Sequence, residues 1–125
     1  MIKTLLQETL DNALIPKNIY SYDQRKTGNN ANEYIVYSVS GEVKDSFADN
    51  INLVKHTNIT VRYYYNDELL GDFESRKQIR ENEKLIEQAL EEQGFYMPFG
   101  KFDGGDIDDI GYLVTIFECE FWEVL

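Results

Sequence analysis

The sequence predicts a single α+β domain in which two helices pack on one face of a mostly antiparallel sheet of about five strands. The chain has 125 residues, a length that fits one domain. Segments with helix and strand periodicity follow in the order α-β-β-β-α-β-β, without the alternation of strand and helix that builds a parallel sheet. Hydrophobic residues make up 42% of the chain, enough to offset the entropy lost on folding.

Two segments have the apolar spacing of amphipathic helices. The first covers residues 2–14, and Pro16 follows where the helix should stop. The second covers residues 75–93, with Ser75 as the expected N-cap and Gly94 as the left-handed residue that ends it. One face of each helix should be buried.

The strands are expected at residues 18–22, 34–39, 58–65, 95–99 and 111–124, and loops at residues 23–33, 41–52 and 101–110. Strict alternation makes residues 58–65 the clearest strand, with Ile59, Val61, Tyr63 and Tyr65 on its buried face. The last strand is apolar on both faces for part of its length. We therefore expect a partner subunit or a helix to cover its second face.

The charge of the chain limits its partners. The formal net charge is -11, so most of the surface repels DNA and RNA, although such a surface suits a channel through which DNA slides without sticking. The first 14 residues lack the apolar run of a signal peptide or a membrane span, so we expect synthesis to end in the cytoplasm. Cys119 is the only cysteine, and an internal disulfide is excluded.

An acidic loop is the candidate cation site. Its aspartates, on a loop loosened by two glycines, can converge on a hard cation such as calcium, but the spacing does not match an EF-hand. A solvated turn is the simpler interpretation. The aspartates are Asp103, Asp106, Asp108 and Asp109.

Groups suited to catalysis are sparse. His56 is the only imidazole and has no Ser or Cys at a diagnostic spacing, and Cys119 lies among aromatic residues that favour a core position. Glu118 and Glu120 share one side of a strand, which allows hydrolase chemistry but arises by chance in any acidic strand. We expect a protein without catalytic residues, metal or cofactor, and keep the hydrolase as an alternative.

Aromatic and charged side chains point instead to assembly. Tyr63, Tyr64 and Tyr65 lack the basic groove of a single-strand binder, so sheet packing plus an oligomer contact explains them better. The second helix is basic early and acidic late, the reverse of what the helix dipole favours. One hypothesis is that these charges meet complementary charges on neighbouring subunits, and the alternative is a solvated face. They are Arg76, Lys77 and Arg80, then Glu87, Glu91 and Glu92.

The order of short motifs resembles that of the tail completion, or tail terminator, proteins of long-tailed bacteriophages. The resemblance spans most of the chain and depends on the order of the motifs. The matching residues are Ile15 and Pro16 before Tyr20, the YIVY of residues 34–37, Ala48, Asp49 and Asn50 before the strand at 59–65, Ile86, Ala89 and Leu90 leading to Gly94 and Phe95, and Asp109, Gly111, Tyr112, Phe117 and Phe121.

The resemblance implies a virion subunit that forms a homo-oligomeric ring, expected to be a hexamer, on the finished tail tube. Such a ring contacts the tail tube protein and a head completion or connector protein, and DNA passes through it. A head completion or connector protein is the nearest alternative, and a calcium-binding or small-ligand module is another. The candidate interaction residues are Phe47, Asp49, Asn50, Tyr64, Asp103, Asp106, Asp108, Tyr112 and Trp122.

Overall fold

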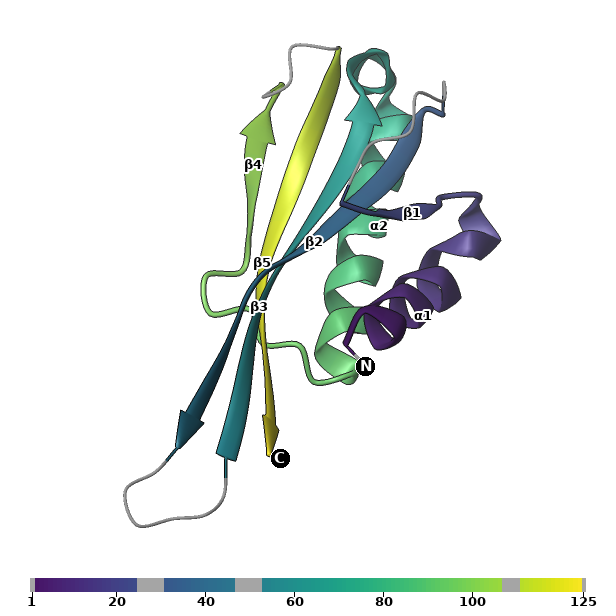
Figure 1. Ribbon diagram of the computed structural model, residues 1–125. Coiled ribbons are helices and arrows are strands. Elements are labelled where there is room, and N and C mark those ends of the chain that lie inside the picture. The colour runs from purple at the N-terminus through teal and green to yellow at the C-terminus, as the bar shows by residue number, and fades with distance from the viewer. Residues whose placement is uncertain (1, 25–30, 47–52, 107–110, 125) are drawn as a thin grey trace.

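The computed structural model describes residues 2–24, 31–46, 53–106 and 111–124, and it confirms the α+β class. The element order is the predicted one, with two short 3-10 helices added (Figure 1). The elements are α1 (Ile2–Leu14), η1 (Ile15–Lys17), β1 (Ser21–Asp23), β2 (Glu33–Ser46), β3 (Leu53–Asn66), η2 (Asp67–Gly71), α2 (Phe73–Glu92), β4 (Lys101–Gly105) and β5 (Tyr112–Val124).

The five strands form one sheet in the order β1-β2-β3-β5-β4. β1 pairs in parallel with β2, and every other neighbouring pair is antiparallel. The three long strands β2, β3 and β5 form the middle of the sheet and run past the helices as a projecting ribbon (Figure 1). No helix within the described ranges is long and apolar enough to cross a bilayer.

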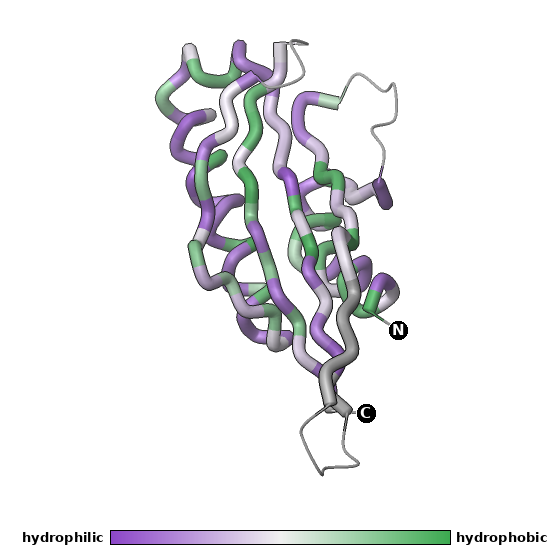
Figure 2. The backbone as a smooth tube through the Cα atoms, turned by 60° about the vertical axis from the view of Figure 1, so that its left-hand side comes forward, coloured by the Kyte–Doolittle hydropathy of each residue, from purple (hydrophilic) through white to green (hydrophobic). Residues whose placement is uncertain are grey.

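The main core lies between the helices and one face of the sheet. Along the long strands hydrophobic and hydrophilic residues alternate, as Figure 2 shows, so each strand sends every second side chain toward α1 and α2. Ile59, Val61, Tyr63 and Tyr65 are all buried in this core, as predicted. The helices contribute Ile2, Leu6, Leu10 and Leu14 from α1 and Ile79, Ile86 and Leu90 from α2.

Local hydrogen bonds set the two ends of α2. The helix starts earlier than predicted because Asp72, not Ser75, is its N-cap, and the Asp72 carboxylate accepts hydrogen bonds from the backbone N–H and hydroxyl of Ser75. Gly94 has φ 90° and ends the helix as predicted. Its N–H donates to Glu91 O, and Phe95 N–H donates to Leu90 O, the pattern of a Schellman motif.

Two predicted loops contain strand. Residues 41–46 were expected to be loop, but they continue β2 after a bulge between Val39 and Gly41. Pairing with β3 satisfies their backbone groups whatever side chains they carry, so the polar composition misled the prediction. Residues 47–52 lie outside the described residues. Residues 101–105, expected in the acidic loop, form β4 against β5.

The strand predicted at residues 95–99 is reduced to one bridge between Tyr96 and Glu120. Phe95 is held by the end of α2, and Gly100 N–H donates to Met97 O in a turn, so the chain bends here. The strand begins only after this turn, at Lys101. The first predicted strand is also shorter, covering Ser21–Asp23.

Candidate interaction surface

The face of the sheet opposite the helices is called the open face, and the register fixes its composition. Residues paired directly across neighbouring strands point to the same face. One row runs across the whole sheet and a second lies beside it, and both are rich in aromatic and apolar side chains. The first row is Tyr22, Val36, Arg62, Ile116 and Phe102, and the second is Tyr34, Tyr64 and Val114.

Tyrosines of the chain itself cover one end of the open face, where β2 and β5 begin and β3 ends. The Tyr34 ring stacks on Tyr64 with centroids 5.0 Å apart, and Tyr112 tilts against Tyr34 at 5.5 Å. Tyr64 is consequently only 4% exposed, and Val114 is fully buried. The expectation that a helix or partner must cover the second face of the last strand is therefore wrong for this part, because side chains from β2 and β3 cover it.

The edge strand β4 approaches this small cluster closely. A Cβ on Gly104 would lie 2.8 Å from Cγ1 of Val114 and 2.9 Å from Cδ1 of Ile116, so only glycine fits at this bulge without a shift. Phe102, two residues earlier, pairs with Ile116 and extends the apolar row to the edge of the sheet. Phe102 is 46% exposed.

A second aromatic group lies on the projecting ribbon. His56 and Trp122 pair across β3 and β5 and stack with ring centroids 4.0 Å apart and an interplanar angle of 6°. Trp122 is 52% exposed. Tyr96, also exposed, bridges to Glu120 next to this pair. The open face therefore has exposed aromatic side chains beside the tyrosine cluster, at Phe102, and farther along the ribbon, at Tyr96 and Trp122.

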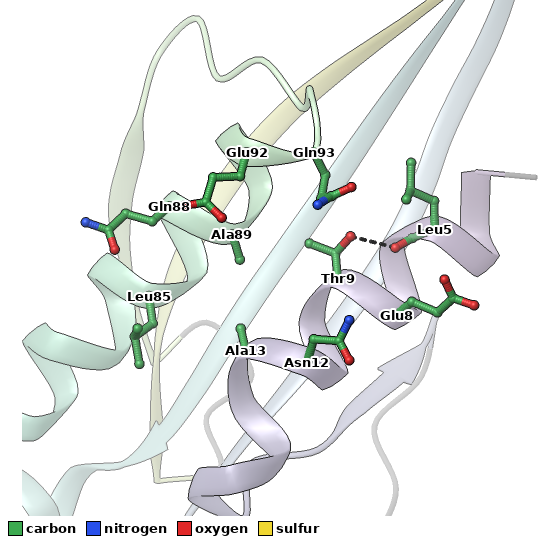
Figure 3. Close-up of a pocket in the computed structure, with 10 residues that line it drawn as sticks. All are labelled: Leu5, Glu8, Thr9, Asn12, Ala13, Leu85, Gln88, Ala89, Glu92 and Gln93. Atoms are coloured by element: carbon green, nitrogen blue, oxygen red, sulfur yellow. Dashed lines mark hydrogen bonds between the residues drawn. The ribbon is translucent and has the colours of Figure 1, made fainter.

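The acidic groups considered for catalysis meet only in part. His56 Nε2 lies 3.6 Å from Glu120 Oε1, whereas Glu118 Oε2 accepts a hydrogen bond from Thr60 Oγ1 at 3.1 Å. Both carboxylates point to the open face, as their spacing predicted. They lie on the sheet and do not line the pocket between α1 and α2 (Figure 3), which is bordered by Leu5, Ala13, Leu85 and Ala89.

The aspartates predicted as a cation site are separated. Asp103 is exposed on β4 and pairs with Thr115, which places it on the helix side of the sheet edge. Asp106 Oδ2 accepts a hydrogen bond from the backbone N–H of Gly111 at 2.9 Å, which links the end of β4 to the start of β5. Asp108 and Asp109 lie outside the described residues. Within the described ranges no group of three His, Cys, Asp or Glu side chains gathers as a metal site.

A polar network joins α2 to the covered face of the sheet. Asn82 Nδ2 donates to Glu33 Oε1 at 3.0 Å and to Tyr63 Oη at 3.2 Å, and the Tyr63 hydroxyl also donates to Glu33. Burial and the hydrogen bond to the Glu33 carboxylate raise the pKa of Tyr63 well above its usual range. The tyrosine therefore stays neutral and acts as a donor.

A second buried polar group is the next residue of α2, Glu83. The Glu83 side chain is 3% exposed and accepts hydrogen bonds from Arg80 Nη1 at 2.9 Å and from the Thr115 hydroxyl. Buried polar groups of this kind fix the register of a helix on a sheet, because any shift leaves them unsatisfied. Both networks are filled by the chain's own groups, which indicates a structural role.

Cys119 belongs to the main core, as predicted. Burial raises the pKa of its thiol from 9.0 to about 12. The nucleophilic thiolate is therefore disfavoured at neutral pH.

The structure places the predicted interaction residues in different settings. Tyr64 and Tyr112 meet in the tyrosine cluster, and Trp122 is exposed on the ribbon. Asp103 lies on β4 and Asp106 directly follows that strand, and Phe47, Asp49, Asn50 and Asp108 lie outside the described residues. Phe102 was missed because β4 is short and rich in glycine, so its alternation gives almost no signal. Tyr96 was missed as well, since its exposure follows from a single bridge to Glu120.

Comparison with known proteins gives no match to a family model and no similar curated protein. A function for this chain is therefore inferred from the surfaces described above and from the order of motifs in the sequence.

Proposed function

We propose that this chain is a structural subunit of a bacteriophage virion that caps the completed tail tube and joins the tail to the head. In this proposal the subunits form a ring, the ring has no catalytic activity, and DNA passes through it without tight binding. The tail tube protein and a head completion or connector protein are the partners on its two sides.

The open face of the sheet is the observation that carries the proposal. Neither α1 nor α2 lies over it, yet it presents the exposed aromatic side chains of Phe102, Trp122 and Tyr96. Aromatic residues are enriched where proteins meet, because they bury a large area at low cost in side-chain entropy. We assign this face to the contact with the tail tube.

The projecting ribbon supports the same assignment. The strands β2, β3 and β5 extend past both helices, so the ribbon that they form projects beyond the body of the subunit (Figure 1). An extension of this kind gives a ring subunit a way to reach the next protein along the tail axis. Trp122 stands on this ribbon, stacked on His56, so it is already held in one orientation for contact.

The charge of the chain agrees with a DNA conduit. A net charge of -11 on 125 residues makes adhesion of DNA to most of the surface unfavourable.

The buried polar groups agree with a structural protein. Asn82 and Glu83 have hydrogen-bond partners inside the fold, and Cys119 is buried with a raised pKa, so these side chains have structural roles.

A complementation assay tests the proposal. Phage tails made without their terminator are mixed with the purified chain, and capped tails that join to heads are counted by electron microscopy and plaque titre. We expect capping by the wild-type chain and a loss of about tenfold or more for the double variant Phe102→Ala with Trp122→Ala. Failure of the wild-type chain on tails of its own phage would reject the proposal.

The matched control is Ile15→Ala, which removes an exposed apolar side chain on the helical side of the molecule. It should cap as well as the wild type. The head-side alternative makes a different prediction, since a head completion protein binds filled heads that lack tails and leaves isolated tubes uncapped. Incubation with each particle separately therefore distinguishes the two positions in the neck.

A further inference from the structure

The strand β4 is an open edge of the sheet. It is the outermost strand on its side, and no described residue pairs with its outer edge (Figure 1). The edge at β1 is different, because Gln7 Nε2 of α1 donates to Ser21 O at 3.4 Å and Lys3 Nζ pairs with Asp23 Oδ2 at 3.2 Å. Side chains of α1 therefore cover the edge at β1, whereas the edge at β4 is left open.

The hydrogen-bond pattern shows which backbone groups of β4 face outward. Tyr96 and Glu120 exchange both backbone hydrogen bonds, at 2.8 and 2.7 Å, so the backbone groups of Glu120 point away from β3. This direction alternates along a strand, so the backbone groups of Ile116, four residues earlier, also point away from β3 and toward their partner Phe102 on β4. The N–H and C=O groups of Phe102 are therefore directed to β5.

Lys101 and Asp103, the neighbours of Phe102, have their backbone N–H and C=O groups on the outer side of β4. Groups of this kind are a template for another extended strand, which offers donors and acceptors at the same spacing. After Asp103 the bulge at Gly104 breaks the regular pairing, so the open segment consists of three residues. The edge therefore fits a short strand.

The sequence of this segment is complementary to itself. When two copies of β4 run antiparallel with Phe102 opposite Phe102, Lys101 of each copy lies opposite Asp103 of the other. A shift by two residues in either direction places Lys101 opposite Lys101 or Asp103 opposite Asp103, and like charges directly opposite each other are destabilising. The charges therefore select one register, with a two-fold axis at Phe102.

The side chains at this edge suit that register. Lys101 Nζ contacts Glu87 at 3.1 Å, but the side chain is 34% exposed, and an ammonium group with three donors can bind a second carboxylate. Asp103 is exposed and forms no ion pair with a described residue. Phe102, 46% exposed, would face its equivalent in a non-hydrogen-bonded pair, where side chains on neighbouring strands are closest.

A second exposed aromatic side chain borders the edge. Phe99 is 83% exposed and lies in the turn directly before β4, where Gly100 N–H donates to Met97 O. In an antiparallel pair the start of one β4 meets the end of the other, so Phe99 approaches Gly104 and Gly105 of the second copy. A Cβ on Gly105 would have no atom within 4 Å, so this end of the strand has room for the ring.

We propose that two copies of the chain pair through β4, antiparallel about a two-fold axis at Phe102, so that their sheets become continuous. Each of the two Lys101–Asp103 pairs exchanges two backbone hydrogen bonds and joins opposite charges. The contact is short, and the net charge of -11 on each copy opposes it, so the association is weak. A two-fold contact closes with two copies and does not build a ring, so this inference goes beyond the proposed function and is independent of it.

A cysteine at the axis tests the geometry. Residues opposite each other in a non-hydrogen-bonded pair have Cα atoms about 4.5 Å apart, within the range of a disulfide, so Phe102→Cys should form a covalent dimer on mild oxidation. Trp122→Cys is the matched control, because Trp122 is a similarly exposed aromatic residue of the open face away from β4. Phe102→Cys should cross-link at least about tenfold faster. Equal rates would overturn the proposal.

Charge reversal tests the register. Lys101→Glu and Asp103→Lys each bring like charges together at both pairs, so each variant should associate about tenfold or more weakly than the wild type. An equimolar mixture of the two should associate again, because every pair then joins opposite charges. Lys77→Glu and Glu81→Lys, at exposed positions of α2, change the net charge equally and should associate like the wild type. Sedimentation at concentrations up to about 1 mM measures association, and circular dichroism confirms folding.

Amide exchange tests the strand pairing. In the wild-type chain the amides of Lys101 and Asp103 should exchange freely at low protein concentration and about tenfold or more slowly at high concentration, whereas the Phe102 amide should be protected at both. Association without this protection places the contact elsewhere and overturns the proposal.

The remaining outcomes are equally decisive. Restoration in the mixture supports the contact, because a mere loss of β4 in the single variants cannot be restored by mixing. Reversal variants that associate like the wild type overturn it, as does a wild-type chain that stays monomeric at the highest concentration. A chain that pairs through β4 and caps no tails leaves the pairing standing and overturns the proposed function alone.

Discussion

The two faces of the sheet are built from the same three long strands, but their side chains are covered in different ways. The covered face packs apolar side chains against α1 and α2 and adds two polar networks that anchor α2. No helix of the described residues lies over the open face, and tyrosines cover one end of it while Trp122 and Phe102 remain exposed. The covered face therefore stabilises the fold, and the open face is left available for contact.

The difference shows that packing against one face of the sheet is enough to stabilise a small domain. Full burial on one side supplies the main core, so the other side needs only enough cover to keep Val114 and Ile116 from water. The remaining side chains of the open face are not needed for the core and can contact other proteins. Substitutions on the two faces should accordingly affect different properties.

The largest effect is expected at the centre of the covered face. Phe117 is fully buried between the sheet and the helices, and Phe117→Ala should lower the free energy of unfolding by about 3–5 kcal/mol. Urea titration followed by circular dichroism measures the change. Phe102→Ala, on the open face, is the matched control and should change stability by less than about 1 kcal/mol. Equal losses for the two variants would remove the distinction between the faces.

The polar networks should come next. Asn82→Ala removes three hydrogen bonds, to Glu33, Tyr63 and Gln78, and should cost about 1–3 kcal/mol because it leaves the buried Tyr63 hydroxyl with one partner fewer. The neighbouring Glu81 is exposed, so Glu81→Ala should be within about 0.5 kcal/mol of the wild type. The same urea titration applies. A neutral Asn82→Ala would mean that apolar packing alone positions α2.

A smaller loss is expected where β4 meets the open face. Gly104→Val places side-chain atoms against Val114 and Ile116, and relief of the clash should cost about 1–2 kcal/mol and displace β4. Amide exchange of residues 101–105 should increase, while exchange in β3 should not change. Gly71→Val is the control, because nothing lies within 4 Å of a Cβ at that position. Unchanged exchange in β4 would contradict the close packing.

The smallest expected effect is on the pH dependence of stability, through the buried thiol of Cys119 on the covered face. Because the folded-state pKa of Cys119 is raised from 9.0 to about 12, its contribution to stability is complete below pH 9 and is lost as pH rises toward 12. Cys119→Ala should flatten the fall in stability in that range. Tyr63 acts in the same direction at higher pH, since its pKa is also raised.

Thiol reactivity measures the same difference between faces. Native Cys119 should react with iodoacetamide far more slowly than a cysteine introduced by Asn58→Cys on the open face of the Cys119→Ala protein. In urea the two should react alike. Comparable rates in the native state would mean that water reaches the covered face.

Much of this architecture follows from local patterns. The spacing of Leu6, Leu10 and Leu14 requires a helix with one buried face, and the alternation through Tyr63 and Tyr65 requires a strand against it. Gly94 ends α2 because few other residues accept its backbone conformation. These features depend on neighbours within a few positions, so they can be read without the fold. The sequence likewise indicated that Cys119 belongs to the core.

The tertiary structure decided what depends on distant partners. Residues 41–46 are strand because β3 pairs with them, and residues 101–105 are strand because β5 does. Tyr64 is buried because Tyr34 stacks on it from another strand, although its place in the alternation predicted exposure. The sequence by itself determined which segments are amphipathic and how acidic the chain is. Only the folded chain determined which faces are covered, because burial is set by residues brought together from far apart.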